Sequence, residues 1–167
     1  RLFRISISKG HELIPIRSEV QHAQSYLQIQ SVRYKEQFSY HFDVQEDCTE
    51  YLCNKITLQP IIENAIVHGL DLMVDSGHIE ITVKPDGNDI LLIVADDGIG
   101  IPEADRSRIF ERFYRADSAR TKKAGSIGGT GLGLSIAQSL TELQGGKMSL
   151  AIDGDLFKAI LRFPTVV

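Results

Sequence analysis

The chain has 167 residues, of which 43% are hydrophobic and 24% charged, and its formal net charge at pH 7 is -4. These values are typical of one ordinary globular domain, and they argue against intrinsic disorder. They also argue against nucleic-acid binding, because the longest basic cluster, at residues 120–123, is too short to follow a phosphate backbone. No apolar run approaches the length that spans a bilayer and no leader segment is recognised, so we expect a soluble, cytosolic chain.

Two cysteines, Cys48 and Cys53, lie five positions apart, and no second Cys/His pair accompanies them. We therefore expect reduced thiols and not a zinc site. Apolar side chains are frequent within residues 1–7, which indicates the end of a helix that begins upstream. We expect a fragment, with residues 1–16 as the remnant of an upstream helix and its linker, and residues 17–167 as the folded domain.

The first half of the chain predicts helix, strand and helix in turn. Apolar residues at helical spacing over residues 20–34 predict a helix, with Ser18 as its N-cap. Strict alternation over residues 38–44 predicts a strand with one buried face. A loop and a short helix are expected at residues 46–55. The apolar positions of residues 56–70 then recur every three or four residues, which predicts a helix with one buried face.

The second half predicts two hairpins separated by helices and a loop. Residues 79–94 form the first hairpin, and its second strand is apolar enough to be deeply buried. Short helices are expected at residues 103–114, followed by a polar, glycine-rich segment at residues 115–130 that is a candidate lid. Residues 132–143 predict a helix and residues 148–163 the second hairpin. Together these elements predict a two-layer α/β sandwich, with a mixed, mainly antiparallel sheet and helices on one face.

Asp96 directly follows the buried strand of the first hairpin and precedes Gly98 and Gly100. A carboxylate at this place can accept a hydrogen bond from the exocyclic amine of adenine, and the glycines let the backbone approach the ring. With Ile101 they are candidate nucleotide contacts. A lone D-x-G-x-G pattern is more often a turn that ends a strand, so this motif alone does not decide between the two interpretations.

A second glycine-rich motif, G-T-G-L-G-L, stands immediately before the helix predicted at residues 132–143. Backbone N–H groups at the positive end of a helix can bind phosphate oxygens, which suits a triphosphate. A glycine cluster at a helix start is otherwise a flexible entry loop, and the absence of a following Lys excludes a Walker-type P-loop. The candidate contacts are Gly129, Thr130, Gly131, Leu132, Gly133 and Leu134.

A third motif, L-Q-P-I-I-E-N-A-I-V-H-G at residues 58–69, presents Glu63 and Asn64 from the helix predicted there. The three motifs, in this order and spacing, resemble the N, G1 and G2 boxes of the GHKL (Bergerat-fold) ATPases. Within that superfamily they most resemble the ATP-binding domain of a sensor histidine kinase. The resemblance implies the Bergerat fold, ATP and Mg²⁺ as cofactors, and catalysis by phosphoryl transfer.

The resemblance to the N box assigns Asn64 the role of Mg²⁺ ligand, for which a neutral amide oxygen is chemically suited. Glu63 either supports the same site or polarises the nucleophile. The ATPase branch has its glutamate one turn earlier, where this chain has Pro60, so activation of water is not expected. His68 either lines the nucleotide pocket or is an ordinary half-buried histidine. Val67 replaces the lysine of many histidine kinases, which removes one phosphate contact.

Residues 109–115 resemble the F box, which lies just before the candidate lid. In this interpretation Phe113 belongs to the aromatic pair that anchors the hinge of the lid, and Arg115 reaches the β- or γ-phosphate. The alternative for Arg115 is a solvated surface arginine. Phosphoryl transfer depends mainly on positioning and charge stabilisation, which Mg²⁺, Arg115 and the glycine backbone can supply.

Residues 1–70 are similar to the LytS/YesM class, which has an S-x-S-K-G loop, here at residues 6–10, and a Y-L-x-I-Q-x-x-R helix, here at residues 26–33. The second half instead resembles the commoner sensor kinases, with an F box and G-T-G-L-G-L-S-I. The last glycine motif is reduced, because only Gly154 precedes Phe157 where related sequences often have G-x-G.

His11, followed by Glu12, resembles a phosphoacceptor, but Pro15 is four residues after the histidine and not five. Too few residues separate His11 from Asn64 for a two-helix hairpin and the start of the domain. We therefore interpret His11 as a decoy and expect the acceptor histidine upstream. His22 and His41 are interpreted as an ordinary helix and an ordinary strand residue.

The resemblance thus implies a catalytic domain that transfers the ATP γ-phosphoryl group to a histidine on an upstream dimerisation domain. It also implies a response regulator as partner, and a full-length homodimeric phosphoprotein anchored in the cell membrane with this domain in the cytoplasm. Two alternatives stay open. One is an anti-sigma-type serine kinase of the same superfamily. The other is a nucleotide-binding signalling module without catalysis.

Overall fold

The computed structural model describes residues 13–35, 37–70, 76–98, 101, 103–112, 131–154 and 156–165. The strands in these ranges are β1 (Leu13–Pro15), β2 (Phe38–Val44), β3 (Leu52–Asn54), β4 (Gly77–Asp86), β5 (Asp89–Asp96), β6 (Lys147–Asp153) and β7 (Leu156–Pro164). The helices are α1 (Ile16–Arg33), α2 (Gln59–Asn64) and α3 (Gly133–Leu143), with the short helical turns η1 (Glu46–Cys48), η2 (Ala65–Leu70) and η3 (Glu103–Asp105).

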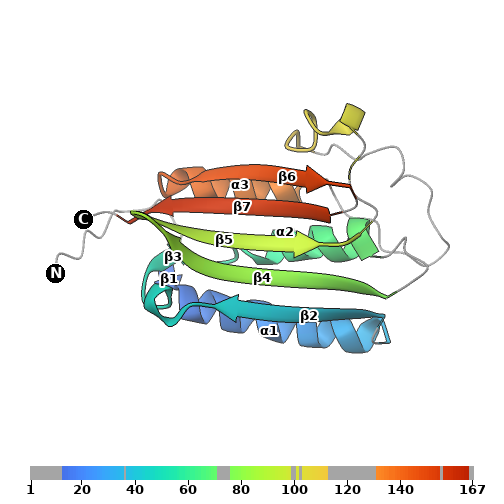
Figure 1. The fold of residues 1–167 in the computed structure, drawn as a ribbon, viewed down its shortest axis with the longest axis horizontal. Coiled ribbons are helices and arrows are strands. Elements are labelled where there is room, and N and C mark those ends of the chain that lie inside the picture. Colours follow the sequence, from blue (N-terminus) through green and yellow to red (C-terminus); the bar gives the residue numbers. More distant parts are fainter. Residues whose placement is uncertain are drawn as a thin grey trace.

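Five of the strands form one sheet in the order β2-β4-β5-β7-β6, and α1, α2 and α3 lie behind it on a single face (Figure 1). The β2–β4 pair is parallel and the other pairs are antiparallel. The predicted two-layer α/β sandwich with a mixed, mainly antiparallel sheet is therefore confirmed. β1 and β3 form a separate two-stranded antiparallel ribbon.

The core lies between the sheet and the three helices. Alternate residues of β4 (Ile79, Ile81 and Val83) are completely buried on the helix side, as the period of a strand requires. The helices face them with apolar stripes at three- and four-residue spacing. No helix within the described ranges is long and apolar enough to cross a bilayer.

Helix α1 starts at Ile16 and not at the predicted cap Ser18, which makes no side-chain cap hydrogen bond. The carbonyl of Tyr51 accepts the N–H of Ile16 at 2.8 Å, and the carbonyl of Thr49 accepts the N–H of Arg17 at 3.0 Å. Backbone groups of a neighbouring loop thus satisfy the free donors of the helix start, so a side-chain cap is unnecessary.

Two other segments differ from their predictions. Residues 46–55, predicted as a loop and a short helix, contain η1 but also the strand β3. The helix predicted at residues 56–70 starts only at Gln59, because Ile56 has a left-handed backbone with φ of 65°. After Asn64 the helix widens into the π-helical turn η2, a geometry that is frequent at functional sites.

Both cysteines are buried and free, as predicted. Burial raises the pKa of the Cys53 thiol to about 12, with a smaller contribution from the charge of Glu19. The thiol therefore stays protonated at neutral pH.

Candidate nucleotide-binding site

Asn64 is the last residue of α2, where the helix passes into η2. The neighbouring residues Ile61, Ile62 and Ala65 are buried in the core, so Asn64 and Glu63 lie on the half-buried side of the helix. Contacts join α2 to both α1 and α3, and η2 to β5. The predicted N box therefore lies next to the helix α3 and the strand β5, which border the other two predicted motifs.

The carboxylate of Glu63, the residue before Asn64, lies close to two polar side chains. Gln59, one turn earlier in α2, donates from Nε2 to Oε1 of Glu63 at 2.9 Å. The hydroxyl of Tyr26 in α1 lies beside this carboxylate, and burial together with the negative charge of Glu63 raises the pKa of Tyr26 well above its usual value. Glu63 therefore links α2 to α1.

Asp96 ends β5, and only 3% of its surface is exposed. Within the described residues, the one hydrogen bond to the carboxylate of Asp96 comes from the N–H of Gly98, at 3.2 Å to Oδ1. Burial raises the pKa of this carboxyl group to about 7. A buried carboxylate with so few partners has acceptor capacity left for a ligand.

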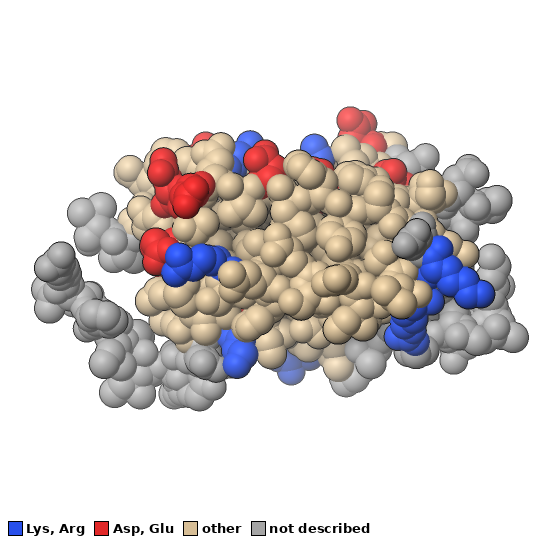
Figure 2. All heavy atoms as spheres, turned by 90° about the horizontal axis from the view of Figure 1, so that it is seen from below, with Lys and Arg blue, Asp and Glu red and all other residues tan. Residues whose placement is uncertain are grey.

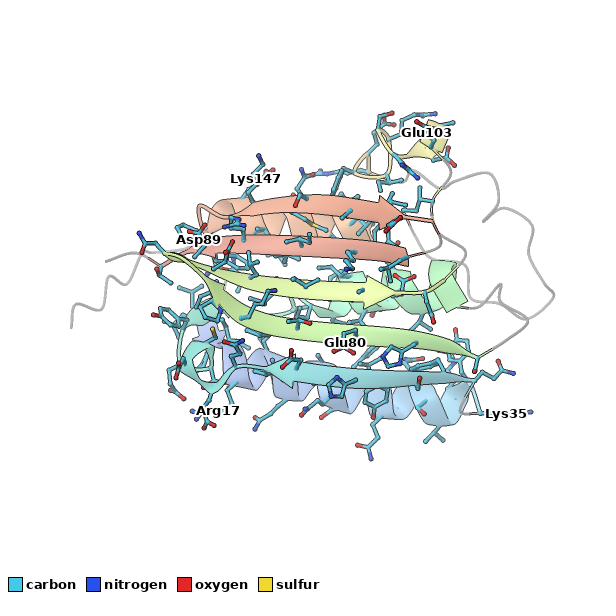
Figure 3. The ribbon with its side chains drawn as sticks, viewed as in Figure 1. Arg17, Lys35, Glu80, Asp89, Glu103 and Lys147 are labelled. Atoms are coloured by element: carbon cyan, nitrogen blue, oxygen red, sulfur yellow. The ribbon has the colours of Figure 1, made fainter. Side chains whose placement is uncertain are left out.

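The turn after Asp96 is fixed to the neighbouring strand by Asp97. Its Oδ1 accepts the N–H of His78 at 2.6 Å, and its own N–H donates to the carbonyl of His78 at 3.3 Å. Asp97 itself is exposed, so the two adjacent carboxylates have different roles. One anchors the turn, and the other faces the interior at the end of β5. In Figure 3, Asp89 marks the opposite end of this strand.

Gly133 brings the start of α3 against α2. A Cβ atom at this position would lie 2.8 Å from the carbonyl oxygen of Pro60, so only glycine permits this approach. Gly131, two residues earlier, has φ of 73°, which glycine adopts without strain. Leu134 is buried and Leu132 half-buried. The sequence predicted Gly133 as a phosphate contact, and the structure adds a packing role for it.

Several predicted site residues lie outside the described residues, namely Gly100, Phe113, Arg115, Gly129 and Thr130, and so do the side chain of His68 and the candidate lid. Ile101 is described and packs against the core, as do Ile109 and Phe110 of the predicted F box. The short helices predicted at residues 103–114 are reduced to η3 and the turns that follow it up to residue 112.

Glu19, which was not predicted from the sequence, is a buried carboxylate in α1 whose oxygens accept hydrogen bonds from the turn before α2. The sequence does contain a pattern that indicates its burial, because Glu19 lies within the apolar stripe of α1, between Ile16 and Ala23 at helical spacing. A charged residue inside such a stripe is either buried with partners or breaks the pattern.

A family model described as "Histidine kinase-, DNA gyrase B-, and HSP90-like ATPase" matches residues 53–165. The chain belongs to this family. A second model, described as "Histidine kinase", matches residues 1–38 of the chain. The two matches confirm the family that the three motifs predicted, and the ATP-binding domain of the sensor histidine kinase type.

Curated relatives are sensor histidine kinases. WalK of Bacillus subtilis is 40% identical over 95 residues, which is 56% of this chain and 15% of WalK. BtsS of Escherichia coli is 28% identical over 122 residues, which is 66% of this chain and 22% of BtsS. ArlS of Staphylococcus aureus is 39% identical over 102 residues, or 59% of this chain and 21% of ArlS. The chain thus spans less than a quarter of the length of these relatives.

Solved structures of histidine kinases share the fold. AdeS of Acinetobacter baumannii superposes with a TM-score of 0.68 at 17% identity, covering 95% of this chain and 68% of AdeS. The catalytic domain of ThkA gives a TM-score of 0.68 at 19% identity, covering 92% of this chain and 98% of that domain. At these identities the similarity establishes the architecture alone.

Proposed function

We propose that this chain binds Mg-ATP as the catalytic domain of a sensor histidine kinase, and that it transfers the γ-phosphoryl group to a histidine on an upstream dimerisation domain. The observation that carries the proposal is Asp96, a buried carboxylate at the end of β5 that accepts one hydrogen bond from the part of the chain that the structure describes. An exocyclic adenine amine supplies the donor that this carboxylate lacks. The crystal structure of ShkA in complex with AMPPNP, whose fold matches this chain with a TM-score of 0.67 at 23% identity, is consistent with a nucleotide here.

The described residues fit a bound magnesium nucleotide. Asn64 offers a neutral amide oxygen at the half-buried end of α2, which suits a Mg²⁺ ion that already carries phosphate oxygens. The N-terminal end of α3 lies against α2 through the contact of Gly133 with Pro60, so its backbone N–H groups are available to phosphate oxygens near Asn64. When bound, Mg²⁺ would neutralise charge on the phosphates.

We assign roles to the other predicted site residues from the motifs in which they stand. Glu63 supports Asn64, and His68 lines the pocket. Arg115, preceded by Phe113 at the hinge of a lid at about residues 115–130, stabilises the charge of the transferred group. Gly100, Gly129 and Thr130 complete the backbone contacts to adenine and phosphates. The acceptor imidazole nitrogen would attack the γ-phosphorus, and ADP would leave.

The partners we propose are those of a two-component system. The crystal structure of ThkA with response regulator protein TrrA, whose kinase matches this fold with a TM-score of 0.64 at 18% identity, supports a receiver domain as the downstream partner. We further propose that residues 1–16 lead from the dimerisation domain, and that the full-length homodimer is membrane-anchored with this domain on the cytoplasmic side.

The test is a titration of the chain with a fluorescent ATP analogue, with and without Mg²⁺. We expect Asp96→Asn to abolish binding, and Asn64→Ala to remove the gain in affinity that Mg²⁺ gives. Asp89→Asn is the matched control, because Asp89 lies at the other end of the same strand in an exposed ion pair with Arg162 (Figure 3). Wild-type protein that folds but does not bind the analogue would reject the proposal.

Transfer is tested on the full-length protein with labelled ATP. Acid-labile, base-stable label is expected, as for phosphohistidine. Acid-stable label on serine would favour the serine-kinase alternative, and nucleotide binding without any label would favour the non-catalytic module.

A further inference from the structure

Glu19 is the only acidic residue of α1, and it faces inward. Its exposed fraction is 1%, although the helix has a long outer surface. That outer surface carries Arg17 and Arg33 near its two ends, and the broad middle of the side formed by α1 and β2 shows neither acidic nor basic residues (Figure 2). A carboxylate in the core is costly unless its oxygens are hydrogen-bonded.

Both oxygens of Glu19 are bonded to one turn, the segment that leads from β3 to α2. Oε1 accepts the N–H of Leu58 at 2.9 Å, and Oε2 accepts the N–H of Ile56 at 3.0 Å. The backbone at Ile56 has the left-handed conformation, with φ of 65°, which is rare for a β-branched residue. Such a backbone persists only where its surroundings hold it.

The same turn is tied to α3. The hydroxyl of Thr57 donates to the carbonyl of Asn54 at 2.6 Å, and Nδ2 of Asn54 donates to the carbonyl of Leu140 at 2.8 Å. The N–H of Asn54 also donates to Oε1 of Gln144 at 2.7 Å. The turn is therefore connected by hydrogen bonds to α1 on one side and α3 on the other.

The position of this turn sets the position of Asn64. Helix α2 is only six residues long, from Gln59 directly after the turn to Asn64, so it behaves as a short rigid rod. Tyr26 lies two turns after Glu19 on the same side of α1, and its hydroxyl lies beside Glu63 near the far end of α2. Helix α1 thus hydrogen-bonds the turn at the start of α2 through Glu19 and contacts the far end of α2 through Tyr26.

We propose that Glu19 is a positioning residue for the Mg²⁺ ligand. By holding the strained turn at Ile56, it sets the start of α2, and through this short helix it sets where the amide of Asn64 stands relative to the phosphates. This inference rests on the proposed role of Asn64. A residue that only stabilised the core would affect folding and leave the magnesium dependence of a folded variant unchanged.

The experiment compares four variants by their affinity for the fluorescent ATP analogue with and without Mg²⁺, after thermal unfolding has shown that each is folded. Glu19→Gln keeps the shape but replaces one acceptor oxygen by an NH₂ group, which faces an N–H donor. We expect it to reduce the Mg²⁺-dependent gain in affinity by about tenfold, with little change in the affinity without Mg²⁺. Glu50→Gln, the same change in an exposed ion pair with Arg17, is expected to match the wild type.

A second-site change makes the test specific. Ile56→Gly removes the strain of the left-handed backbone, because glycine adopts this conformation freely. The side chain that it deletes is half exposed, so the single variant should bind the ATP analogue like the wild type. Combined with Glu19→Gln, it should restore most of the lost Mg²⁺ dependence, because the turn no longer needs both hydrogen bonds. A folded double variant without recovery would overturn the inference, as would a Glu19→Gln protein with full Mg²⁺ dependence.

If Glu19→Gln does not fold, Tyr26→Phe replaces it, since it removes one hydroxyl at the other end of α2. A reduced Mg²⁺-dependent gain in this variant supports positioning by α1, and an unchanged gain refutes it. Failure of the proposed function looks different. In that case the wild type itself shows no Mg²⁺-dependent gain, or Asn64→Ala leaves the gain intact.

Discussion

The substitution Asp96→Asn should stabilise the folded protein while it removes nucleotide binding. In the folded state burial raises the pKa of Asp96 from 3.8 to about 7. A carboxyl group with a raised pKa binds its proton more tightly in the folded than in the unfolded state. Its contribution to stability is therefore fully present below about pH 4, and it is lost as the pH rises toward 7.

The expected gain in the free energy of unfolding follows from the size of the pKa shift of Asp96. Three pKa units at about 1.4 kcal/mol each amount to about 4 kcal/mol of folding free energy that ionised Asp96 costs above pH 7. Asparagine carries no charge, and its Oδ1 can still accept the N–H of Gly98. We expect Asp96→Asn to be more stable than wild type by about 2 kcal/mol at pH 5 and by up to about 4 kcal/mol at pH 8.

The assay is urea unfolding of the wild type, Asp96→Asn and the control Asp89→Asn at several pH values from 5 to 8. Nucleotide binding is measured on the same samples. The control should follow the wild type, because exposed ion pairs contribute little. The reasoning would be refuted if Asp96→Asn were less stable than wild type at pH 8, or if the difference between them did not grow with pH.

Three further substitutions or measurements test other contacts. Gly133→Ala should cost about 1–3 kcal/mol in urea unfolding and weaken nucleotide binding, because its Cβ would lie 2.8 Å from the Pro60 carbonyl oxygen; a neutral effect would contradict the close packing of α3 on α2. The pKa of His41, which is raised because its ring Nδ1–H donates to the carboxylate of Glu80, should be measurably high by NMR titration and return toward its ordinary value in Glu80→Gln; an unchanged value would show that the pair does not form in solution. Cys53 should resist alkylation in the folded protein at pH 8 and react in urea, since burial raises its pKa to about 12; rapid labelling without urea would contradict its burial.

The long elements could be predicted because many residues carry each pattern. The hairpin of β4 and β5 follows from alternating and continuous apolar positions, and α3 follows from its spacing between two glycine motifs. The place of Asp96 could be predicted too, since the buried strand before it was evident. Asn64 and the glycine motif before α3 came from motif resemblance, and the structure shows that Gly133, at the start of α3, lies close to the backbone of Pro60 in α2.

The short elements could not be predicted, because contacts between distant segments determine them. β1 and β3 have three residues each, too few for any periodicity, and they form by pairing with one another. The start of α1 depends on carbonyl groups of residues 49 and 51. The left-handed Ile56 contradicts the local preference of a β-branched residue, and it is understood only with the carboxylate of Glu19 beside it.

The two buried carboxylates Glu19 and Asp96 differ in the number of hydrogen-bond donors that the described residues provide. Glu19 has both oxygens bonded to the backbone before α2, whereas Asp96 receives one N–H from Gly98. A buried acid whose oxygens are satisfied holds structure in place, and one left short of donors retains capacity for a ligand. Glu19 and Asp96 are similarly buried, so burial does not distinguish them. The number of hydrogen-bond donors around each carboxylate distinguishes the residue that positions α2 from the residue that binds a ligand. Neutralising Glu19 should therefore cost stability, whereas neutralising Asp96 should increase it.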